Sequence, residues 1–365
     1  MTEDFNKIKR IWFITDTHFG VRNNSNEWID LMQSYFDDWF IPLVKKNYKD
    51  GDILVHLGDV YDSRQSINLK VLNYSIDIFE KLSDIFKKGI YIMAGNHDLW
   101  GKTSNEINSL KALKWIPGVR IIEEPATFTF SGKSFFFMPW RKDHQAESEC
   151  LNSAKPHDFL LCHSDIRGLK FNRYVNIEKG IDQKELKKFK RVFSGHIHYA
   201  QDNGLVRLFG SPYELTRSDM GNKKGIMLLD IEANDEMFFE NKHSPRFLKI
   251  DFNRVLESTP EEANRILAND FVDITIDPRM ALKAPLSIFT DTVTTPRGIF
   301  FHPHDPNQAG LIVHDIENNE NNKFSVLDFI ETYVSAMELD DETKSKLVKS
   351  INKLYSLATA GPEKK

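Results

Sequence analysis

The chain has 365 residues, of which 41% are hydrophobic and 28% are charged, and this balance excludes an intrinsically disordered protein. The formal net charge of −5 excludes binding of nucleic acid through overall positive charge, so a polyanionic substrate would need bound cations or local basic patches. Two cysteines are too few for a disulfide scaffold, and neither a secretory signal nor a membrane span is recognisable, so we expect a cytoplasmic protein without membrane association.

Five short apolar runs between residues 11 and 196 predict strands that are buried on both faces of a sheet. Helical patterns lie between them, as in Leu69–Phe86, where apolar residues recur at every third or fourth position. This alternation predicts an α/β domain over residues 1–243, in which polar sites gather at the carboxyl ends of the strands. The predicted strands are 11–16, 53–59, 90–98, 159–163 and 191–196.

The pattern changes near residue 243 and predicts a second, smaller unit. Residues 244–252 are expected to form a strand, and 258–268 a helix that Ser258 or Thr259 can cap. Residues 271–277 alternate between apolar and polar side chains, as in a half-buried strand. We therefore interpret 244–314 as a small α+β domain.

The last fifty residues predict a helical pair after a polar linker at 315–324. The first helix begins near a capping-box pattern at Ser325 and Asp328, and Asp340 and Asp341 precede the second. Both helices fall within 325–358, and 359–365 is a tail. Two amphipathic helices of this kind either fold back on the main body or dock a partner protein.

Polar residues follow each of the five predicted strands. The motif AGNHD at 94–98 is compatible with a metal site, a proton relay or a tight surface turn. Imidazole and carboxylate groups together suit transition metals such as manganese, iron or zinc. The candidate ligands are Asp16, His18, Asp59, Asn96, His163, His196 and His198.

The spacing of these residues suits a pair of metal ions. Asp16 and His18 would point to the same side of an extended segment and reach one ion together. His196 and His198 would lie about 6.6 Å apart along a strand, one imidazole for each of two ions roughly 3.5–4 Å apart. Asp59, with two carboxylate oxygens, is the natural bridge between the ions.

In this order, the motifs resemble those of the calcineurin-like metallophosphoesterases. The resemblance implies a four-layer α/β/β/α sandwich that carries the small α+β domain as a cap, followed by the helical pair. It implies one metal at Asp16, His18, Asp59 and His198, and the other at Asp59, Asn96, His163 and His196. It also implies that His97 stabilises the transition state or protonates the leaving oxygen, and that Asp98 orients His97. The motifs are Asp16-x-His18, Gly58-Asp59-x-x-Asp62, Gly95-Asn96-His97-Asp98, His163 and Gly195-His196-x-His198.

Within this family the chain is most similar to the SbcD nucleases, which are relatives of the meiotic recombination eleven nuclease. The stretches DTHFGV, GDVYDSR and GSPYELTRSD carry that similarity, and the short chain resembles the recombination endonuclease subunit of T-even-type phages. Many cellular members carry His where this chain has Asp62, and that His is linked to exonuclease action. The resemblance therefore supports the metal site more strongly than it supports exonuclease activity. Asp62 is expected either to cap a turn or to contact an active-site group such as Arg64 or His97.

The resemblance implies a DNA nuclease with two divalent ions, most simply Mn2+, with Mg2+, Fe2+ or Zn2+ as alternatives. It would cut single strands internally and digest duplex ends from 3′ to 5′, in the host cytoplasm if the gene is carried by a phage. Its expected partners are DNA and an SbcC-like coiled-coil ATPase that docks on residues 325–357. We expect a homodimer within a 2:2 heterotetramer, with the apolar face of Leu69–Phe86 as a candidate dimer surface.

Two other functions fit the same residues. The chain could act on phosphoproteins or small phosphodiesters, or it could be an inactive scaffold, although the complete ligand set argues against the scaffold.

The basic stretch 187–191 and the pair Lys223–Lys224 are candidate contacts to the DNA backbone. The cluster FHPHD at 301–305 resembles a metal site but is read as a loop, His56 as a core histidine and Cys162 as a small buried hydrophobic residue.

Overall fold

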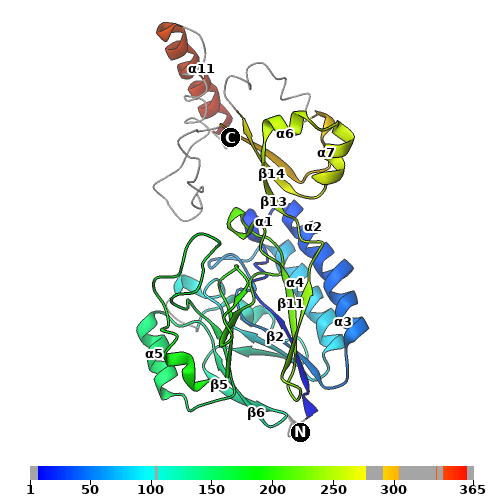
Figure 1. Ribbon diagram of the computed structural model, residues 1–365, viewed down its shortest axis with the longest axis vertical. Helices are drawn as coiled ribbons and strands as arrows, with labels where there is room; N and C mark the ends of the chain where they lie inside the picture. Colours follow the sequence, from blue (N-terminus) through cyan, green and yellow to red (C-terminus); the bar gives the residue numbers. More distant parts are fainter. Residues whose placement is uncertain (1–6, 103–105, 277–290, 304–333, 335–339, 360–365) are drawn as a thin grey trace, which may run out of the picture. The chain divides into compact units, whose positions relative to one another are not determined.

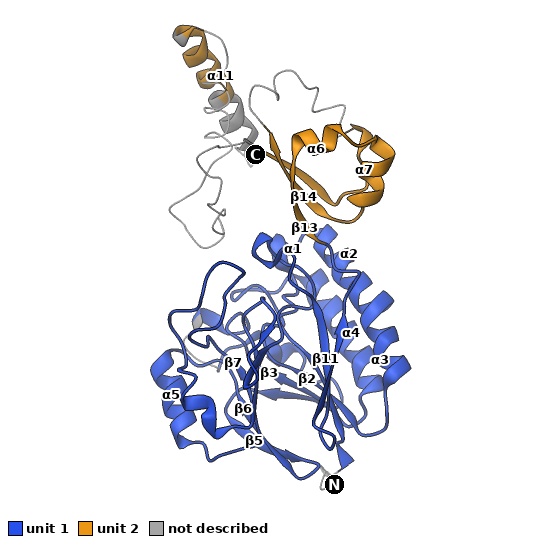
Figure 2. Cartoon of the chain, viewed as in Figure 1, with its two compact units in different colours: residues 1–245 blue, residues 246–365 orange. Residues whose placement is uncertain are grey.

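The computed structural model describes residues 7–102, 106–276, 291–303, 334 and 340–359. The chain divides into two compact units, residues 1–245 and 246–365 (Figure 2). No helix within the described ranges is long and apolar enough to cross a membrane.

Unit 1 is built on two six-stranded mixed sheets. In the first sheet, β1 to β4 run parallel, while β11 and β12 are antiparallel additions at one edge, in the order β12-β11-β1-β2-β3-β4. Its strands are β1 Arg10–Ile14, β2 Asp52–His56, β3 Ile90–Met93, β4 Val119–Ile122, β11 Gly225–Asp230 and β12 Asp235–Glu240.

The second sheet has the order β5-β6-β7-β8-β10-β9, with a parallel centre and antiparallel edge strands. Its strands are β5 Ala126–Phe130, β6 Lys133–Met138, β7 Phe159–His163, β8 Arg191–Gly195, β9 Gln201–Asp202 and β10 Val206–Leu208. The five strands expected from the sequence are all present as β1, β2, β3, β7 and β8.

The two sheets face each other across an aromatic and aliphatic core. Phe13, Val55 and Met93 of the first sheet pack in one buried cluster with side chains such as Phe137 and Phe193 of the second. Helices α2 to α4 lie on the outer side of the first sheet and α5 on the outer side of the second (Figure 1). The four-layer α/β/β/α sandwich expected from the sequence is therefore confirmed.

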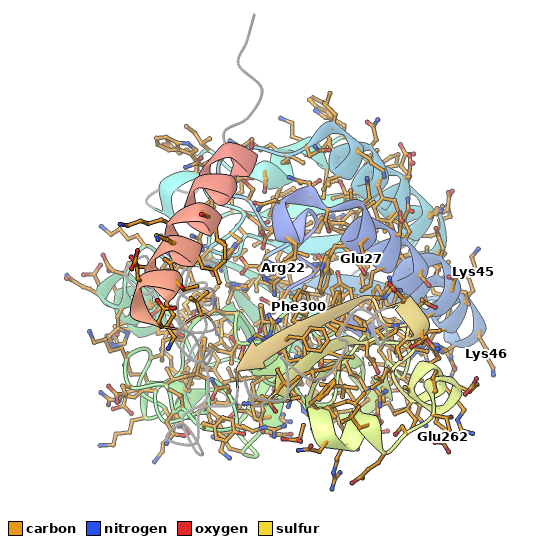
Figure 3. The ribbon with its side chains drawn as sticks, turned by 90° about the horizontal axis from the view of Figure 1, so that it is seen from above. Arg22, Glu27, Lys45, Lys46, Glu262 and Phe300 are labelled. Carbon is orange, nitrogen blue, oxygen red and sulfur yellow. The ribbon has the colours of Figure 1, made fainter. Side chains whose placement is uncertain are left out.

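Three helices of unit 1 begin at residues whose side chains accept hydrogen bonds from the first turn. Ser25, Asn68 and Asp143 cap α2, α4 and α5 in this way. Lys45 and Lys46 lie in the last turn of α3, where positive charge favours the helix end, and project from it (Figure 3). The helices are α1 Val21–Asn24, α2 Asn26–Ser34, a π-helix Tyr35–Phe40, α3 Ile41–Asn47, α4 Leu69–Ile85 and α5 His144–Ser153, with 3-10 turns at Trp100–Lys102, Ser109–Ala112, Glu185–Lys188 and Arg217–Asp219.

The apolar face of α4 is only partly buried. Val71, Ile78, Phe79 and Leu82 are buried in the packing of α4 on its own unit. Leu69 is exposed and Leu72 and Ile76 are half-buried, so a dimer surface on α4 stays a prediction that would use these outer side chains.

Unit 2 contains a three-stranded sheet in the order β13-β14-β15, with all strands parallel. Its elements are β13 Phe247–Asp251, α6 Phe252–Leu256, α7 Pro260–Ile266, β14 Phe271–Ile276 and β15 Gly298–Pro303. Thr259 caps α7 in a capping box with Glu262, one of the two caps expected from the sequence. The central strand β14 is almost entirely buried, and not half-buried as its alternating pattern indicated, because it has a neighbour on both sides.

The second predicted C-terminal helix is α11, Asp341–Thr359. Asp340 begins it, since its carboxylate accepts hydrogen bonds from the backbone N–H and the hydroxyl of Thr343, at 2.9 and 2.7 Å. The linker 315–324, most of the first helix of the pair and nearly all of the tail 359–365 lie outside the described residues.

Candidate metal centre

The seven predicted ligands come together at one edge of unit 1. Each follows, or ends, a strand of the parallel part of a sheet, and the carboxyl ends of parallel strands meet at the same edge. Asp16 and His18 follow β1, Asp59 follows β2, Asn96 follows β3, His163 ends β7, and His196 and His198 follow β8.

Four of these residues have left-handed backbone conformations. The φ angles are 51° at Asp16, 47° at His18, 55° at Asp59 and 79° at His196. A side chain with a Cβ pays about 1–3 kcal/mol for such a conformation, so the surrounding fold has to hold it in place. Strain concentrated at one edge of the sheets is typical of a functional site.

The Asp-x-His and His-x-His pairs do not lie in extended segments. Strand β1 ends at Ile14 and β8 at Gly195, so both pairs lie in turns beyond the strands. The prediction that each pair is part of an extended segment is therefore wrong. They converge because the left-handed turns redirect successive side chains.

Gly95 is needed for space and not for an unusual turn. A Cβ at this position would lie 2.2 Å from Oδ1 of Asp59 and 2.3 Å from its backbone nitrogen. The loop that follows β2 and carries Asp59, called the β2 loop below, therefore approaches the backbone of the AGNHD motif more closely than any residue other than glycine at position 95 would allow.

One group of ligand atoms consists of Asp16, His18 and His198, whose coordinating atoms lie within 4.8 Å of one another. Nε2 of His18 and Nε2 of His198 are only 3.1 Å apart. Nδ1 of His18 lies 3.2 Å from the Asp62 carboxylate and donates to it, so in the neutral ring that a metal requires the lone pair is on Nε2 and faces His198. Lone pairs in such an arrangement fit a cation between them.

The second group consists of Asp59, His163 and His196, again within 4.8 Å. Nδ1 of His163 donates to the carbonyl of Leu57 at 2.8 Å, so Nε2 presents its lone pair to Oδ1 of Asn96 at 3.1 Å and Oδ2 of Asp59 at 3.3 Å. Nδ1 of His196 is buried and has no hydrogen-bond partner among the described residues. These are acceptor atoms without donors, which is the chemistry of a metal site.

Asp59 belongs to the second group and also faces the first. Its Oδ2 is 3.7 Å from Nε2 of His18 and 3.3 Å from Nε2 of His163, so one oxygen faces both sets. Its Oδ1 accepts the backbone N–H of His97 at 2.7 Å, which fixes the carboxylate plane. The donor set therefore fits two divalent metal ions that share the Asp59 carboxylate.

The same carboxylates attract protons to the imidazoles. Burial alone would lower the pKa of His18, but Asp62, Asp59 and Asp16 outweigh it and raise the pKa to about 9. Burial also acts to lower the pKa of His163, and Asp59 raises it to about 9. Protons therefore compete with metal for both rings, so metal binding releases protons and strengthens as the pH rises.

His97 is oriented differently from the ligands. Its Nδ1 donates to the backbone carbonyl of Asp62 at 2.7 Å, and its Nε2 accepts from the guanidinium of Arg64 at 2.8 Å. Burial lowers the pKa of His97 to about 4, so the ring is neutral near pH 7. Both nitrogens of this imidazole are used in contacts that keep it beside His18, with ring centroids 4.7 Å apart.

The predicted role of Asp98 is wrong. Its carboxylate is buried and accepts the backbone N–H groups of Gly95, Asp59, Val60 and Tyr61, at 2.9, 2.9, 3.0 and 3.1 Å. His97 is instead oriented by the two partners described above. Asp98 therefore fixes the backbone of the β2 loop, which carries Asp59.

Asp62 and Arg64 prove to have distinct contacts. Asp62 contacts His18 through its carboxylate and His97 through its backbone carbonyl. Arg64 contacts His97 and also the backbone carbonyl of Asn96, at 3.1 Å. Both residues therefore support the centre from the loop after β2, and the link between Asp62 and His18 was not anticipated.

A buried ion pair lies behind His198 and was missed from the sequence. Nζ of Lys224 donates to Asp219 at 2.8 Å, to Ser211 at 3.0 Å and to the backbone carbonyl of His198 at 2.6 Å. Lys224 is only 3% exposed, so the prediction that it contacts DNA is wrong. The SPYELTRSD stretch followed by KKG is the signal that could have located this pair.

Most of the basic stretch 187–191 is also engaged within the fold. Arg191 pairs with Asp202 and Glu236, and Lys188 donates to backbone carbonyls at the end of α5. Lys190 pairs with Asp158, but its side chain is 76% exposed, and a surface pair of this kind is weak. These contacts remove Lys188 and Arg191 as candidate DNA contacts and leave Lys190 accessible.

His56 and Cys162 are buried, as predicted. His56 lies between the hydroxyl of Thr17 and the backbone N–H of Gly58, and burial lowers its pKa to about 3. Cys162 is part of a hydrophobic cluster. The prediction that FHPHD forms a loop is wrong for its first three residues, because they end strand β15 and pair with β14. His302 contacts Asp273 at 2.9 Å, and His304 and Asp305 lie outside the described residues.

Asp62→Ala is expected to weaken divalent metal binding by about 10- to 100-fold, the usual effect of losing a partner that orients a ligand. Nδ1 of His18 would lose its acceptor, whereas the backbone carbonyl that holds His97 would remain. Asp62→Asn keeps an acceptor oxygen for Nδ1 of His18 and should therefore lose less metal affinity than Asp62→Ala. Calorimetric titration with Mn2+ measures both variants, and unchanged affinity in Asp62→Ala would leave only a turn-capping role.

The chain is similar in sequence or structure to known phosphoesterases and nucleases. The sequence profile described as calcineurin-like phosphoesterase matches residues 9–200, more than half of the chain. Exonuclease subunit 1 of Enterobacteria phage T4 is 28% identical over 256 residues, which span 67% of this chain and 73% of that protein. The SbcD subunit of the SbcCD nuclease of Staphylococcus epidermidis is 25% identical over 265 residues, 62% of this chain and 67% of that protein. A solved structure described as a novel archaeal phosphodiesterase is 15% identical and covers 64% of this chain and 99% of its own, with a TM-score of 0.33.

Proposed function

Because the chain belongs to the calcineurin-like phosphoesterase family, we propose that it is the metal-dependent nuclease subunit of an SbcCD-like recombination and repair complex. It hydrolyses DNA phosphodiester bonds, as an endonuclease on single strands and as a 3′-5′ exonuclease on duplex ends. The names of its relatives, one an exonuclease subunit and the other part of a nuclease, support this substrate class.

One observation carries the proposal: two groups of acceptor atoms share the Asp59 carboxylate, with His97 beside them. Two divalent ions held there would polarise a phosphodiester and lower the pKa of a water molecule. Mn2+ is the expected metal, since imidazole and carboxylate ligands occur together. The proposed ligands are Asp16, His18, Asp59 and His198 for one ion and Asp59, Asn96, His163 and His196 for the other.

His97 assists the departing deoxyribose oxygen in this proposal. A phosphodiester that binds beside His97 brings negative charge, which favours the protonated ring. Arg64 donates to Nε2 of His97 in the free protein, and its guanidinium would move from that nitrogen to a phosphate oxygen when the phosphodiester binds. Nε2 is then free to take a proton from solvent and to give it to the leaving oxygen, while the Asp62 carbonyl holds Nδ1 on the opposite side of the ring.

The remaining parts of the chain have roles in the same proposal. Residues 1–243 form the nuclease domain, 244–314 a cap that contacts DNA, and 325–357 the docking element for a coiled-coil ATPase. The chain forms a homodimer within a 2:2 complex in the cytoplasm. The name of the staphylococcal relative, which is one subunit of a larger nuclease, supports the partner.

A nuclease assay on end-labelled DNA tests the proposal, with Mn2+ or Mg2+ and with or without the ATPase and ATP. Single-stranded DNA should be cut with Mn2+ alone, EDTA should stop the reaction, and added Mn2+ should restore it, because the site binds metal reversibly. Duplex digestion should require the ATPase and ATP. Turnover of 4-nitrophenyl phosphate without any DNA cleavage would instead favour a phosphatase or a small-molecule phosphodiesterase.

A further inference from the structure

The segment after β7 forms a hairpin beside the metal centre, which we call the 166–181 hairpin. An antiparallel bridge between Lys170 and Asn176 pairs its two arms near the tip, and a parallel bridge between Ile166 and Ile181 closes its base. Ile166, Ile181, Leu169 and Ile177 are buried in the hydrophobic cluster under the second sheet. The base of the hairpin is therefore rooted in the fold.

The tip of the hairpin exposes large apolar side chains. Tyr174 is 61% exposed, Phe171 41% and Val175 36%. The tip is also ordered, because Oδ1 of Asn172 accepts the backbone N–H groups of Tyr174 and Val175, both at 2.9 Å. Exposed apolar side chains that gather on one short segment, rather than singly, indicate a binding surface.

The hairpin has the charge of a polyanion-binding element. Residues 166–181 contain four cations, Arg167, Lys170, Arg173 and Lys179, and a single carboxylate. Asp165 and Asp182 flank the hairpin, and Asp182 pairs with Arg167, so Lys170, Arg173 and Lys179 are the cations left for a polyanion. The guanidinium of Arg173 lies 5.7 Å from the ring centroid of Tyr174. Cations interleaved with exposed aromatic rings are the pattern by which proteins bind single-stranded nucleic acid.

Contacts place the base of the hairpin beside the metal centre. At the base, Oδ1 of Asp165 is 3.4 Å from Nε2 of His196. At the tip, Arg173 donates to the backbone carbonyl of Met220, next to the Asp219 carboxylate that lies behind His198. A strand bound along the hairpin would therefore reach the proposed site of hydrolysis at the base of the hairpin.

We propose that the 166–181 hairpin binds the unpaired DNA strand next to the bond that is cut, with bases stacked on Tyr174 and Phe171 and phosphates bound by Lys170 and Arg173. This rests on the proposed nuclease function. A base can stack on an exposed ring only when its own face is free, so the site selects single strands over duplex. Duplex DNA would need to be opened before it could use this surface.

Tyr174→Ala tests the proposal through binding and turnover separately. In a His97→Ala background with Mn2+, the dissociation constant of a labelled oligothymidylate should rise by roughly 10-fold or more when stacking on Tyr174 is lost. In the otherwise native chain, KM for single-stranded DNA should rise similarly, while hydrolysis of bis(4-nitrophenyl) phosphate should not change. Tyr174→Phe keeps the ring and should bind like the native chain.

Trp115→Ala is the matched control. Trp115 is also an exposed aromatic residue with a cation over its ring, Lys114 at 4.7 Å, but it precedes β4 and so lies toward the opposite edge of the sheet. Its loss should leave DNA binding unchanged. Native affinity in Tyr174→Ala, or equal losses in Tyr174→Phe and Tyr174→Ala, would overturn the stacking site. A native chain that binds the oligonucleotide without cutting it would contradict the nuclease function instead.

Discussion

His97→Ala is expected to lower kcat for DNA cleavage by about 10²- to 10⁴-fold, the usual contribution of a group that assists proton transfer. The side chain lies beside the metal centre, but its two nitrogens are held by the Asp62 carbonyl and by Arg64. Its removal should therefore take away chemistry without removing a ligand. Single-turnover cleavage of labelled single-stranded DNA at saturating Mn2+ measures the loss.

Metal occupancy should survive the same substitution. The backbone N–H of His97, which alanine keeps, holds Oδ1 of Asp59 at 2.7 Å, so the shared carboxylate retains its orientation. Asn96→Ala is the matched comparison, since it removes the neighbouring amide oxygen that faces His163. It should lower metal content, whereas His97→Ala should not. Loss of metal from His97→Ala, measured by elemental analysis, would make His97 a ligand and contradict this division.

Much of the fold was predictable because it depends on local patterns. The apolar runs that became β1, β2, β3, β7 and β8 are buried on both faces, which is what a continuous apolar run predicts. The convergence of the polar residues followed from the rule that the carboxyl ends of parallel strands share an edge. Neither step needed knowledge of distant contacts.

The geometry within the centre could not be predicted in this way. The left-handed conformations at Asp16, His18, Asp59 and His196 have no local signal, since none of these residues is glycine and tertiary contacts impose the turns. The pairing of Asp62 with His18 joins residues 44 positions apart. Burial of Lys224 depends on Asp219 and Ser211 closing around it, and lysine in a sequence usually indicates an exposed side chain.

The case of Asp98 shows where a resemblance between motifs misleads. A carboxylate next to a histidine in the sequence suggests a pair like those that fix imidazole tautomers. Successive side chains in this turn point in different directions, however, and Asp98 turns toward the β2 loop while His97 faces Arg64. Adjacency in the chain therefore did not indicate contact.

Asp98→Ala is accordingly expected to lower the free energy of unfolding by about 3–5 kcal/mol. Each buried donor left without a partner costs about 1–3 kcal/mol, and relaxation of some of these groups reduces the total. Four buried backbone N–H groups would lose their acceptor together. The β2 loop would then no longer hold Asp59, and metal content should fall with stability. The midpoint of urea unfolding, with an unchanged dependence on urea, measures the effect.

Ser109→Ala provides the control for this substitution. It removes one weak donor to the same carboxylate, at 3.4 Å, and leaves the four backbone bonds intact, so it should cost about 1 kcal/mol or less. If Asp98→Ala instead unfolded at the native urea concentration, kept both metal ions and lost only turnover, the carboxylate would be acting on His97 after all. The contacts of Asp98 with the backbone of Asp59, Val60 and Tyr61 lead us to expect the opposite result, in which loss of metal and loss of stability occur together.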